Sequence, residues 1–161
     1  MSRLDDYSDL PLFAGISEEH YFVRSMMIRE KVMPKIKISC SEDAAKFARE
    51  QIGDYDREAM LVMALNNRHG LNATSIVHIG SATESIADTA DIIRVALNSC
   101  SRALIVVHNH PSGDSAPSRE DRAVTKKIKD ACALMNIRFL DHIIIGDGEY
   151  YSFADQGLLF S

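Results

Sequence analysis

The sequence predicts a single α/β domain with three layers, in which helices cover both faces of a mixed β-sheet. Apolar runs of strand length alternate with longer segments of helical period, and two adjacent strand pairs have turn residues between them. The chain has 161 residues, 46% of them hydrophobic, which is enough to bury one continuous core. We expect residues 1–34 to be an N-terminal extension and residues 35–161 to form the domain.

The first predicted elements are two short strands followed by a helix. Tyr21–Ile28 is rich in the bulky apolar and β-branched residues of a strand, and Lys35–Ile38 alternates at the strand period. Ser39 followed by Glu42 resembles a capping box, which predicts the start of a helix, and Gly53 is expected to end it.

A β-hairpin and a second helix come next. Ala59–Leu65 is a continuous apolar run of strand length, Asn66–Gly70 has the composition of a turn, and Leu71–Ile79 is the expected partner strand. Asp88–Ser99 has the period of a helix. The predicted buried face of that helix consists of Ile92, Ile93, Ala96 and Leu97.

The last third of the chain contains the strongest strand signal. Ala103–Val107 is entirely apolar, which predicts a central strand, and Pro111 is expected to end its extension. A helix is predicted from Ser118 to Met135, and Phe139–Ile145 with Tyr150–Phe153 is predicted to form a second hairpin. The expected buried stripe of the helix consists of Val124, Ile128, Ala131 and Leu134.

The composition limits the classes of function. The formal net charge of −5 gives no general attraction for nucleic acid or anionic lipid. Three widely spaced cysteines, without a C-x-x-C pair, favour neither a disulfide framework nor a thiolate metal site. The N-terminus has Asp5 and Asp6 where a signal peptide is basic, and no apolar run approaches the roughly 18 residues of a membrane span. We therefore expect a cytoplasmic protein.

Two histidines and an aspartate have the spacing of a metal site. Side chains alternate along a strand, so His108 and His110 are predicted to point the same way, roughly 6 to 7 Å apart. A tight turn through Gly113 would bring the first turn of the next helix, and with it Asp121, back over the strand end. Two histidines and one carboxylate leave the fourth position of a tetrahedral Zn²⁺ ion for water, which is the catalytic pattern.

Glu58 and Ser118 are the predicted catalytic side chains. A zinc-activated water still needs a base to accept its proton when it attacks an amide carbonyl. Glu58 comes immediately before a strand predicted to lie near the sheet centre, which makes it the candidate base. Ser118 is expected to donate a hydrogen bond to the oxyanion of the transition state.

Each of these patterns has an ordinary structural explanation when it is taken alone. A His-x-His pair at a strand end is usually solvated, Ser-x-x-Asp before an apolar helix is usually a capping box, and an isolated glutamate usually lies on the surface. The joint pattern His-x-His-Pro-x6-Ser-x-x-Asp is different, because its chance occurrence in a chain of this length is below roughly one in ten thousand. The set therefore favours a metal site.

The same residues resemble a known family. The pattern at residues 108–121, with Glu58 upstream, resembles the JAMM (MPN+) metalloprotease motif, and the runs HNHPSGD, PSRED and DHIIIGDG resemble its RadC branch. The resemblance covers roughly residues 35–155 and implies a cytidine-deaminase-like α/β/α fold with one zinc ion. Full-length RadC proteins carry an N-terminal helix-hairpin-helix region, for which 34 residues are too few, so we expect a short form without it.

Further polar residues have two interpretations each. Asp141 and His142 are interpreted either as partners that orient a zinc ligand or, the reading that we favour, as residues at a strand edge that serve packing and turn formation. The remaining histidines have no companion at ligand spacing and are expected to be surface or hydrogen-bonded residues; they are His20, His69 and His78.

The N-terminal extension contains one candidate docking motif. Leu10, Leu12 and Phe13 resemble the short peptides by which bacterial replication proteins bind the sliding clamp, although the usual leading glutamine is Asp9 here. The alternative, which we favour, is an apolar segment that packs on its own domain.

Three functions are compatible with these patterns. The leading hypothesis is a zinc-dependent metallopeptidase or isopeptidase that acts on a peptide or protein substrate. The alternative is a DNA-repair or mobile-element accessory protein whose zinc site is structural or vestigial. Zinc-dependent nucleobase deamination is the least favoured, because the Pro-Cys-x-x-Cys ligand segment of those enzymes is missing from the sequence.

Overall fold

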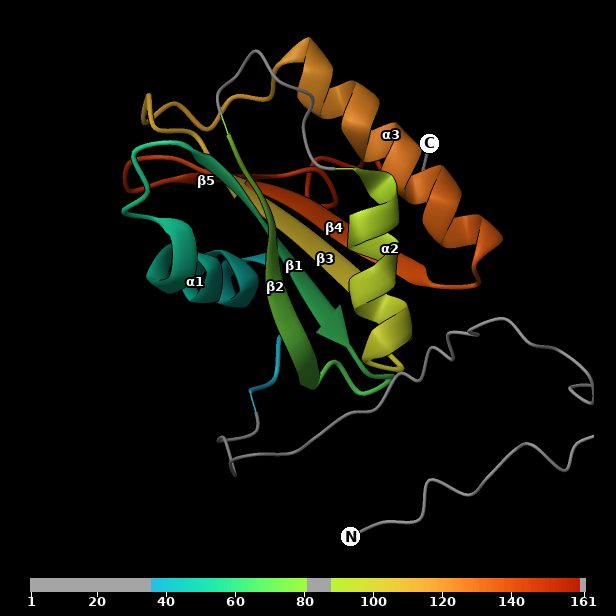
Figure 1. The fold of residues 1–161 in the computed structure, drawn as a ribbon. Coiled ribbons are helices and arrows are strands. Elements are labelled where there is room, and N and C mark those ends of the chain that lie inside the picture. The colour runs from blue at the N-terminus through green and yellow to red at the C-terminus, as the bar shows by residue number, and fades with distance from the viewer. Residues whose placement is uncertain (1–35, 81–87, 160–161) are drawn as a thin grey trace, which may run out of the picture.

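The computed structural model describes residues 36–80 and 88–159, and within them the predicted α/β/α architecture is confirmed (Figure 1). The described strands are β1 Glu58–Leu65, β2 Leu71–Gly80, β3 Ala103–Asn109, β4 Arg138–Ile145 and β5 Tyr150–Ser152. The described helices are α1 Ser41–Ile52, α2 Thr89–Asn98 and α3 Arg119–Leu134. The predicted strand Tyr21–Ile28 and the candidate clamp motif lie outside the described residues.

The five strands form one mixed sheet in the order β2-β1-β3-β4-β5. The β3–β4 pair is parallel, and the other three pairs are antiparallel. Helix α1 covers one face of the sheet, whereas α2 and α3 cover the other, as Figure 1 shows. Side chains alternate between these two layers along β1: Leu61 and Met63 belong to the α1 side, and Met60 and Val62 belong to the α2–α3 side. Strands β1 and β3 are therefore buried on both faces, which explains their continuous apolar sequences.

Two predictions for the start of the domain were wrong. Within the predicted strand Lys35–Ile38, the described residues 36–38 form only an isolated bridge, from Lys37 to Gly70, rather than a strand. Helix α1 begins one residue later than predicted, so Cys40 is the N-cap and makes no side-chain capping bond. Asp43, rather than Glu42, then occupies the third helical position, where its Oδ2 accepts the Ser39 backbone N–H at 2.8 Å.

The predicted buried faces of α2 and α3 are largely confirmed, with one exception on each helix. Ile92, Ile93 and Ala96 of α2 are buried, and Ile128 of α3 is buried with Val124 and Ala131 packed against the same core. Leu97 on α2 is 49% exposed and Leu134 on α3 is 84% exposed. The buried positions of α3 also include Asp121, Thr125 and Cys132, so this face directs a carboxylate and a hydroxyl as well as apolar side chains toward the sheet.

Two further observations bear on the cellular setting. Among the helices of residues 36–80 and 88–159, not one is both long and apolar enough to cross a membrane. The three cysteines are free thiols, and Cys132 alone among them is buried.

Candidate metal centre

The carboxyl end of β3 brings two imidazole rings together. His108 pairs with Met60 of β1 and lies on the α2–α3 side of the sheet, where it is buried. His110 follows at the next position of the same alternation, after the strand has ended. The Nε2 atoms of the two rings lie 3.0 Å apart, and His110 Nδ1 faces the Asp114 carbonyl oxygen at 2.7 Å. The predicted convergence of the two histidines is present.

Asp121 reaches the same point from the first turn of α3. Its Oδ1 lies 3.1 Å from His108 Nε2, and its Oδ2 lies 3.6 Å from His110 Nε2. A reciprocal capping box holds this turn: Ser118 Oγ accepts the Asp121 backbone N–H, and Asp121 Oδ2 accepts the Ser118 backbone N–H at 2.7 Å. The Ser118 hydroxyl donates to the same carboxylate oxygen at 2.6 Å. Asp121 is therefore both a member of the capping box and a candidate metal ligand.

The three donor groups fit a divalent metal ion. A tetrahedral zinc ion with ligand distances near 2.1 Å requires ligand atoms about 3.4 Å apart. The two Nε2 atoms lie 3.0 Å apart, and the Asp121 oxygens lie 3.1 Å (Oδ1 to His108) and 3.6 Å (Oδ2 to His110) from them. The Asp114 carbonyl can only accept, so neutral His110 carries its proton on Nδ1 and directs the Nε2 lone pair inward. Lone pairs that converge on one buried point repel each other unless a cation lies between them.

The electrostatics of the cluster agree with a cation site. Burial opposes ionisation of Asp121, yet the adjacent imidazoles of His108 and His110 hold the pKa of its carboxyl far below the usual range. The contact with Asp121 raises the pKa of His110, against the opposing effect of burial. Both shifts show that positive charge beside the Asp121 carboxylate is favoured.

Glu58 stands on the same side of the sheet as the two histidines. It is the first residue of β1, two positions before Met60, which faces the α2–α3 layer and pairs with His108. The charge of Glu58 contributes to the raised pKa of His110. Glu58, Ser118 and the three candidate ligands are thus brought to one end of the sheet by β1, β3 and α3.

Comparison with known proteins assigns this arrangement to a family. Residues 38–158 match the RadC-like JAB domain, which is about three quarters of the chain. The chain belongs to the RadC-like JAB domain family. The suspected RadC-like relationship is therefore confirmed, and the cluster of His108, His110 and Asp121 lies in a JAB domain as a group compatible with a metal.

Relatives of this JAB domain occur in bacteria and archaea. The chain is 40% identical over 132 residues to a UPF0758 protein of Coxiella burnetii, which covers 82% of this chain and 59% of the relative. It is 38% identical to a UPF0758 protein of Desulforamulus reducens, covering 78% of the chain and 55% of the relative. It is 39% identical to one of Methanosarcina mazei, with the same coverage. The chain thus spans less than two thirds of the length of these relatives.

Asn109 connects β3 to β1 of the JAB domain, a role that the sequence analysis did not predict. It points to the opposite face from His108 and is buried. Its Oδ1 accepts the Ala59 backbone N–H at 2.7 Å, and its Nδ2 donates to the backbone carbonyls of Tyr55 and Arg57 at 3.2 and 3.0 Å. These partners flank Glu58, so Asn109 fixes the backbone on both sides of the candidate base. The available signal was an amide residue at the end of an otherwise apolar strand, between the two histidines.

Removal of the Asn109 amide should destabilise the domain. We expect Asn109→Ala to lower the free energy of unfolding by about 2 to 3 kcal/mol, because the Ala59 N–H is left buried without a partner. The measurement is urea unfolding followed by circular dichroism. Asn67→Ala, in the exposed β1–β2 turn, is the matched control and should be nearly neutral. Equal stability of the two variants would contradict the role of Asn109.

His142 and Thr125 also belong to the site, and our favoured interpretation of His142 was wrong. β4 lies between β3 and β5, so Asp141 and His142 are buried inside the sheet rather than at an edge. His142 Nε2 lies 2.9 Å from His108 Nδ1, and His142 Nδ1 lies 2.6 Å from Thr125 Oγ1. Burial, together with the nearby His108, lowers the pKa of His142 well below its ordinary value. Asp141 points to the other face, where burial raises its pKa to about 6 although Ser152 and Ala154 donate hydrogen bonds to it.

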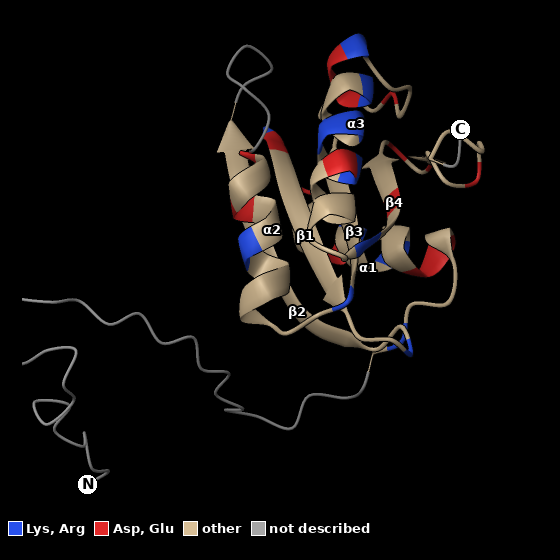
Figure 2. Cartoon of the chain, turned by 90° about the vertical axis from the view of Figure 1, so that its right-hand side faces the viewer, with Lys and Arg blue, Asp and Glu red and all other residues tan. Residues whose placement is uncertain are grey.

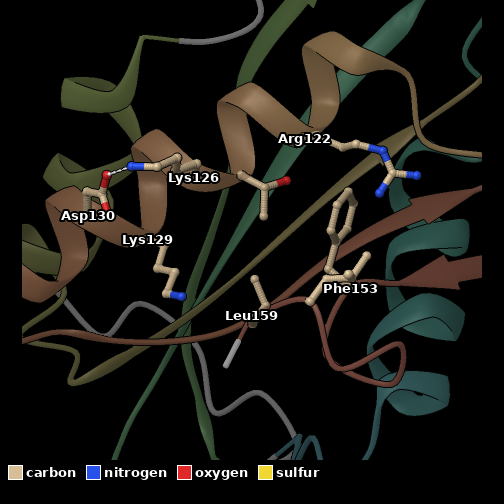
Figure 3. A pocket seen from close by; sticks show the side chains of 8 residues that line it. Arg122, Lys126, Lys129, Asp130, Phe153 and Leu159 are labelled. Atoms are coloured by element: carbon tan, nitrogen blue, oxygen red, sulfur yellow. Dashed lines mark hydrogen bonds and ion pairs between the residues drawn. The ribbon is translucent and has the colours of Figure 1, made fainter. Parts of the chain in front are cut away.

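Two cavities adjoin the centre. One, of about 540 Å³, lies beside His110 and extends between the end of α1, the loop before β1 and the β4–β5 turn. Its charged lining residues are Arg49, Asp54, Asp56 and Asp147. The other, of about 460 Å³, lies along α3 (Figure 3), where Lys126 pairs with Asp130 across 2.7 Å and Phe153 forms part of the wall. The first cavity is the one that includes a candidate metal ligand.

Proposed function

We propose that this JAB domain is a zinc-dependent metallopeptidase or isopeptidase, with zinc held by His108, His110 and Asp121. The observation that carries the proposal is the convergence of two imidazole Nε2 atoms and one carboxylate at separations that suit a tetrahedral ion. Three protein ligands leave a position open, which distinguishes catalytic zinc sites from structural ones. The proposal names zinc because histidine and carboxylate ligands in this number suit it best.

A bound zinc ion would supply a Lewis acid and a water whose pKa is lowered to around 7. The side chains of the protein would carry out the proton transfers. Glu58 accepts a proton as the carbonyl carbon is attacked and delivers that proton to the leaving amine. Because Asn109 fixes the backbone on both sides of Glu58, the carboxylate is positioned before substrate arrives.

Ser118 has two proposed tasks. In the structure its hydroxyl donates to Asp121 Oδ2, which orients the carboxylate toward the histidines. The hydroxyl has one proton, so the predicted second task, donation to the oxyanion of the transition state, requires it to turn from Asp121 Oδ2 toward the substrate. The position of the hydroxyl directly beside the candidate ligands supports this task. Both tasks stabilise negative charge next to the centre.

The substrate is proposed to bind in the 540 Å³ cavity beside His110. His110 is the candidate ligand that lines this cavity, and the carboxylates of the cavity outnumber its single guanidinium among the charged lining residues. Figure 2 shows that Lys and Arg alternate with Asp and Glu along α3, so this helix does not present a uniformly basic face to nucleic acid. A peptide or protein substrate therefore suits the site better than a phosphate backbone.

Hydrolysis should require the metal. The protein, first treated with a chelator and then supplied with one equivalent of zinc, is incubated with mixtures of peptides and of lysine isopeptides, and new amines are quantified. We expect at least a 100-fold higher rate with zinc than without it, and a return to background when the chelator is added again. Asp121→Asn, purified identically, controls for contaminating peptidases.

Two results would contradict the proposed hydrolase function. One is an equal rate with and without zinc, and the other is failure to cleave either substrate class while zinc is bound. The second result would favour the alternative, an accessory protein of DNA repair or of a mobile element in which the metal is structural.

A further inference from the structure

A buried chain of hydrogen bonds connects helix α3 to the candidate metal ligand His108. It begins at the Asp121 backbone carbonyl, which lies 2.6 Å from Thr125 Oγ1. Thr125 Oγ1 lies 2.6 Å from His142 Nδ1, and His142 Nε2 lies 2.9 Å from His108 Nδ1. The side chains along it are at most 5% exposed, and His142 is fully buried. Solvent can approach the hydrogen bonds only from the Thr125 side, where that residue lines the 460 Å³ cavity.

The order of donors and acceptors gives this chain a direction. A carbonyl oxygen only accepts, so the Thr125 hydroxyl donates its one proton to Asp121. Thr125 Oγ1 must then accept from His142 Nδ1–H, which leaves a lone pair on Nε2 of the neutral His142 ring. That lone pair accepts from His108 Nδ1–H. The Nε2 lone pair of His108 is consequently directed at Asp121 and His110.

The surroundings hold the central ring in place. The Phe153 ring stacks on His142, with centroids 5.2 Å apart and planes 8° from parallel. Figure 3 shows Phe153 below α3, where it also forms a wall of the 460 Å³ cavity. Rotation of the His142 ring would break both of its hydrogen bonds and this stacking. These contacts explain why Thr125, a residue with a hydroxyl group, is buried on the same face of α3 as the apolar Ile128 and Cys132.

We propose that Thr125 and His142 are positioning residues that fix His108 as a metal ligand through Nε2 by holding its proton on Nδ1. This inference rests on the proposed metal site, since it explains how one ligand is prepared for the ion. Ligating histidines commonly donate their second N–H to a carboxylate, a carbonyl or water, and loss of such a partner weakens metal binding about 10-fold to 100-fold. Here the imidazole of His142 is the partner of the His108 N–H. The Thr125 hydroxyl, which bonds to the backbone carbonyl of Asp121, fixes the orientation of the His142 ring.

The zinc affinity of Thr125 variants tests the proposal. Affinity is measured by competition with a chromophoric chelator. We expect Thr125→Val, which keeps the shape and removes the hydroxyl, to weaken zinc binding about 10-fold to 100-fold. Thr125→Ser keeps the hydroxyl and should lie within about threefold of the wild type. Thr74→Val, on the exposed face of β2, is the matched control and should not change the affinity. The double variant Thr125→Val/His142→Leu should bind zinc as His142→Leu does, because the chain is already broken.

The proton positions test it independently of zinc. Nitrogen chemical shifts of the metal-free protein distinguish the two neutral tautomers, and we expect Nδ1–H on both His108 and His142. An Nε2–H tautomer of His108, or zinc binding that Thr125→Val leaves unchanged, would overturn the positioning role alone. Failure of the wild-type chain to bind zinc would overturn the proposed function, and this inference with it.

Discussion

Replacement of His110 by alanine or of Asp121 by asparagine is expected to abolish metal binding. The protein purified without chelator and supplied with zinc should hold about one zinc per chain by elemental mass spectrometry, and each variant should hold less than about one tenth of that. The reason is geometric: two remaining donors of the set cannot enclose an ion that three donors at 3.0 to 3.6 Å surround. At a zinc concentration about 1,000 times Kd, the wild type should also gain roughly 4 kcal/mol of stability that the variants lack.

A histidine outside the centre provides the control for this loss. His69→Asn lies in the turn at the far end of β1, and its φ of 60° is a conformation that asparagine tolerates. This variant should retain one zinc per chain. If it lost zinc as His110→Ala does, or if His110→Ala retained zinc, the assignment of the ligands would be wrong.

The parts of the site that sequence reasoning predicted are those set by local periodicity. His108 and His110 are two residues apart in a strand, so alternation alone placed them on one side. Asp121 and Ser118 belong to one helical turn, and a capping box predicts where that turn begins. The short loop between strand and helix left few ways to arrange these two local patterns. The core strands were predicted for the same reason, because β1 and β3 are apolar throughout.

The parts that were not predicted depend on contacts between distant segments. Asn109 bonds to Ala59, 50 residues away, and His142 bonds to His108, 34 residues away. No local period reports such pairs, because the register between strands that are far apart in the sequence is a property of the assembled sheet. The exposure of Leu134 was missed for a related reason. Hydrophobicity favoured Leu134 as a buried residue, whereas the buried positions of α3 include Asp121 and Thr125 and leave Leu134 exposed to solvent.

The strongest test of the chemistry is expected to be Glu58→Gln. This variant keeps the size and hydrogen-bonding capacity of the side chain but cannot accept a proton at neutral pH. We expect its rate of amide hydrolysis to fall by about 10²-fold to 10⁴-fold, the range for loss of a general base. Its zinc content should equal that of the wild type, because Glu58 is not one of the converging ligands. Kinetics and elemental analysis on the same preparation provide both values.

Glu50→Gln provides the matched comparison, since Glu50 is exposed on α1 and the substitution is chemically identical. It should leave both the rate and the zinc content unchanged. A Glu58→Gln protein that hydrolysed substrate at the wild-type rate would exclude Glu58 as the base and leave the metal site intact. Joint loss of activity and zinc would instead mean that Glu58 supports the ligands. Only loss of turnover with zinc retained assigns the proton transfer to Glu58. That outcome would mean that β1 supplies the general base for a metal site formed by the end of β3 and the start of α3.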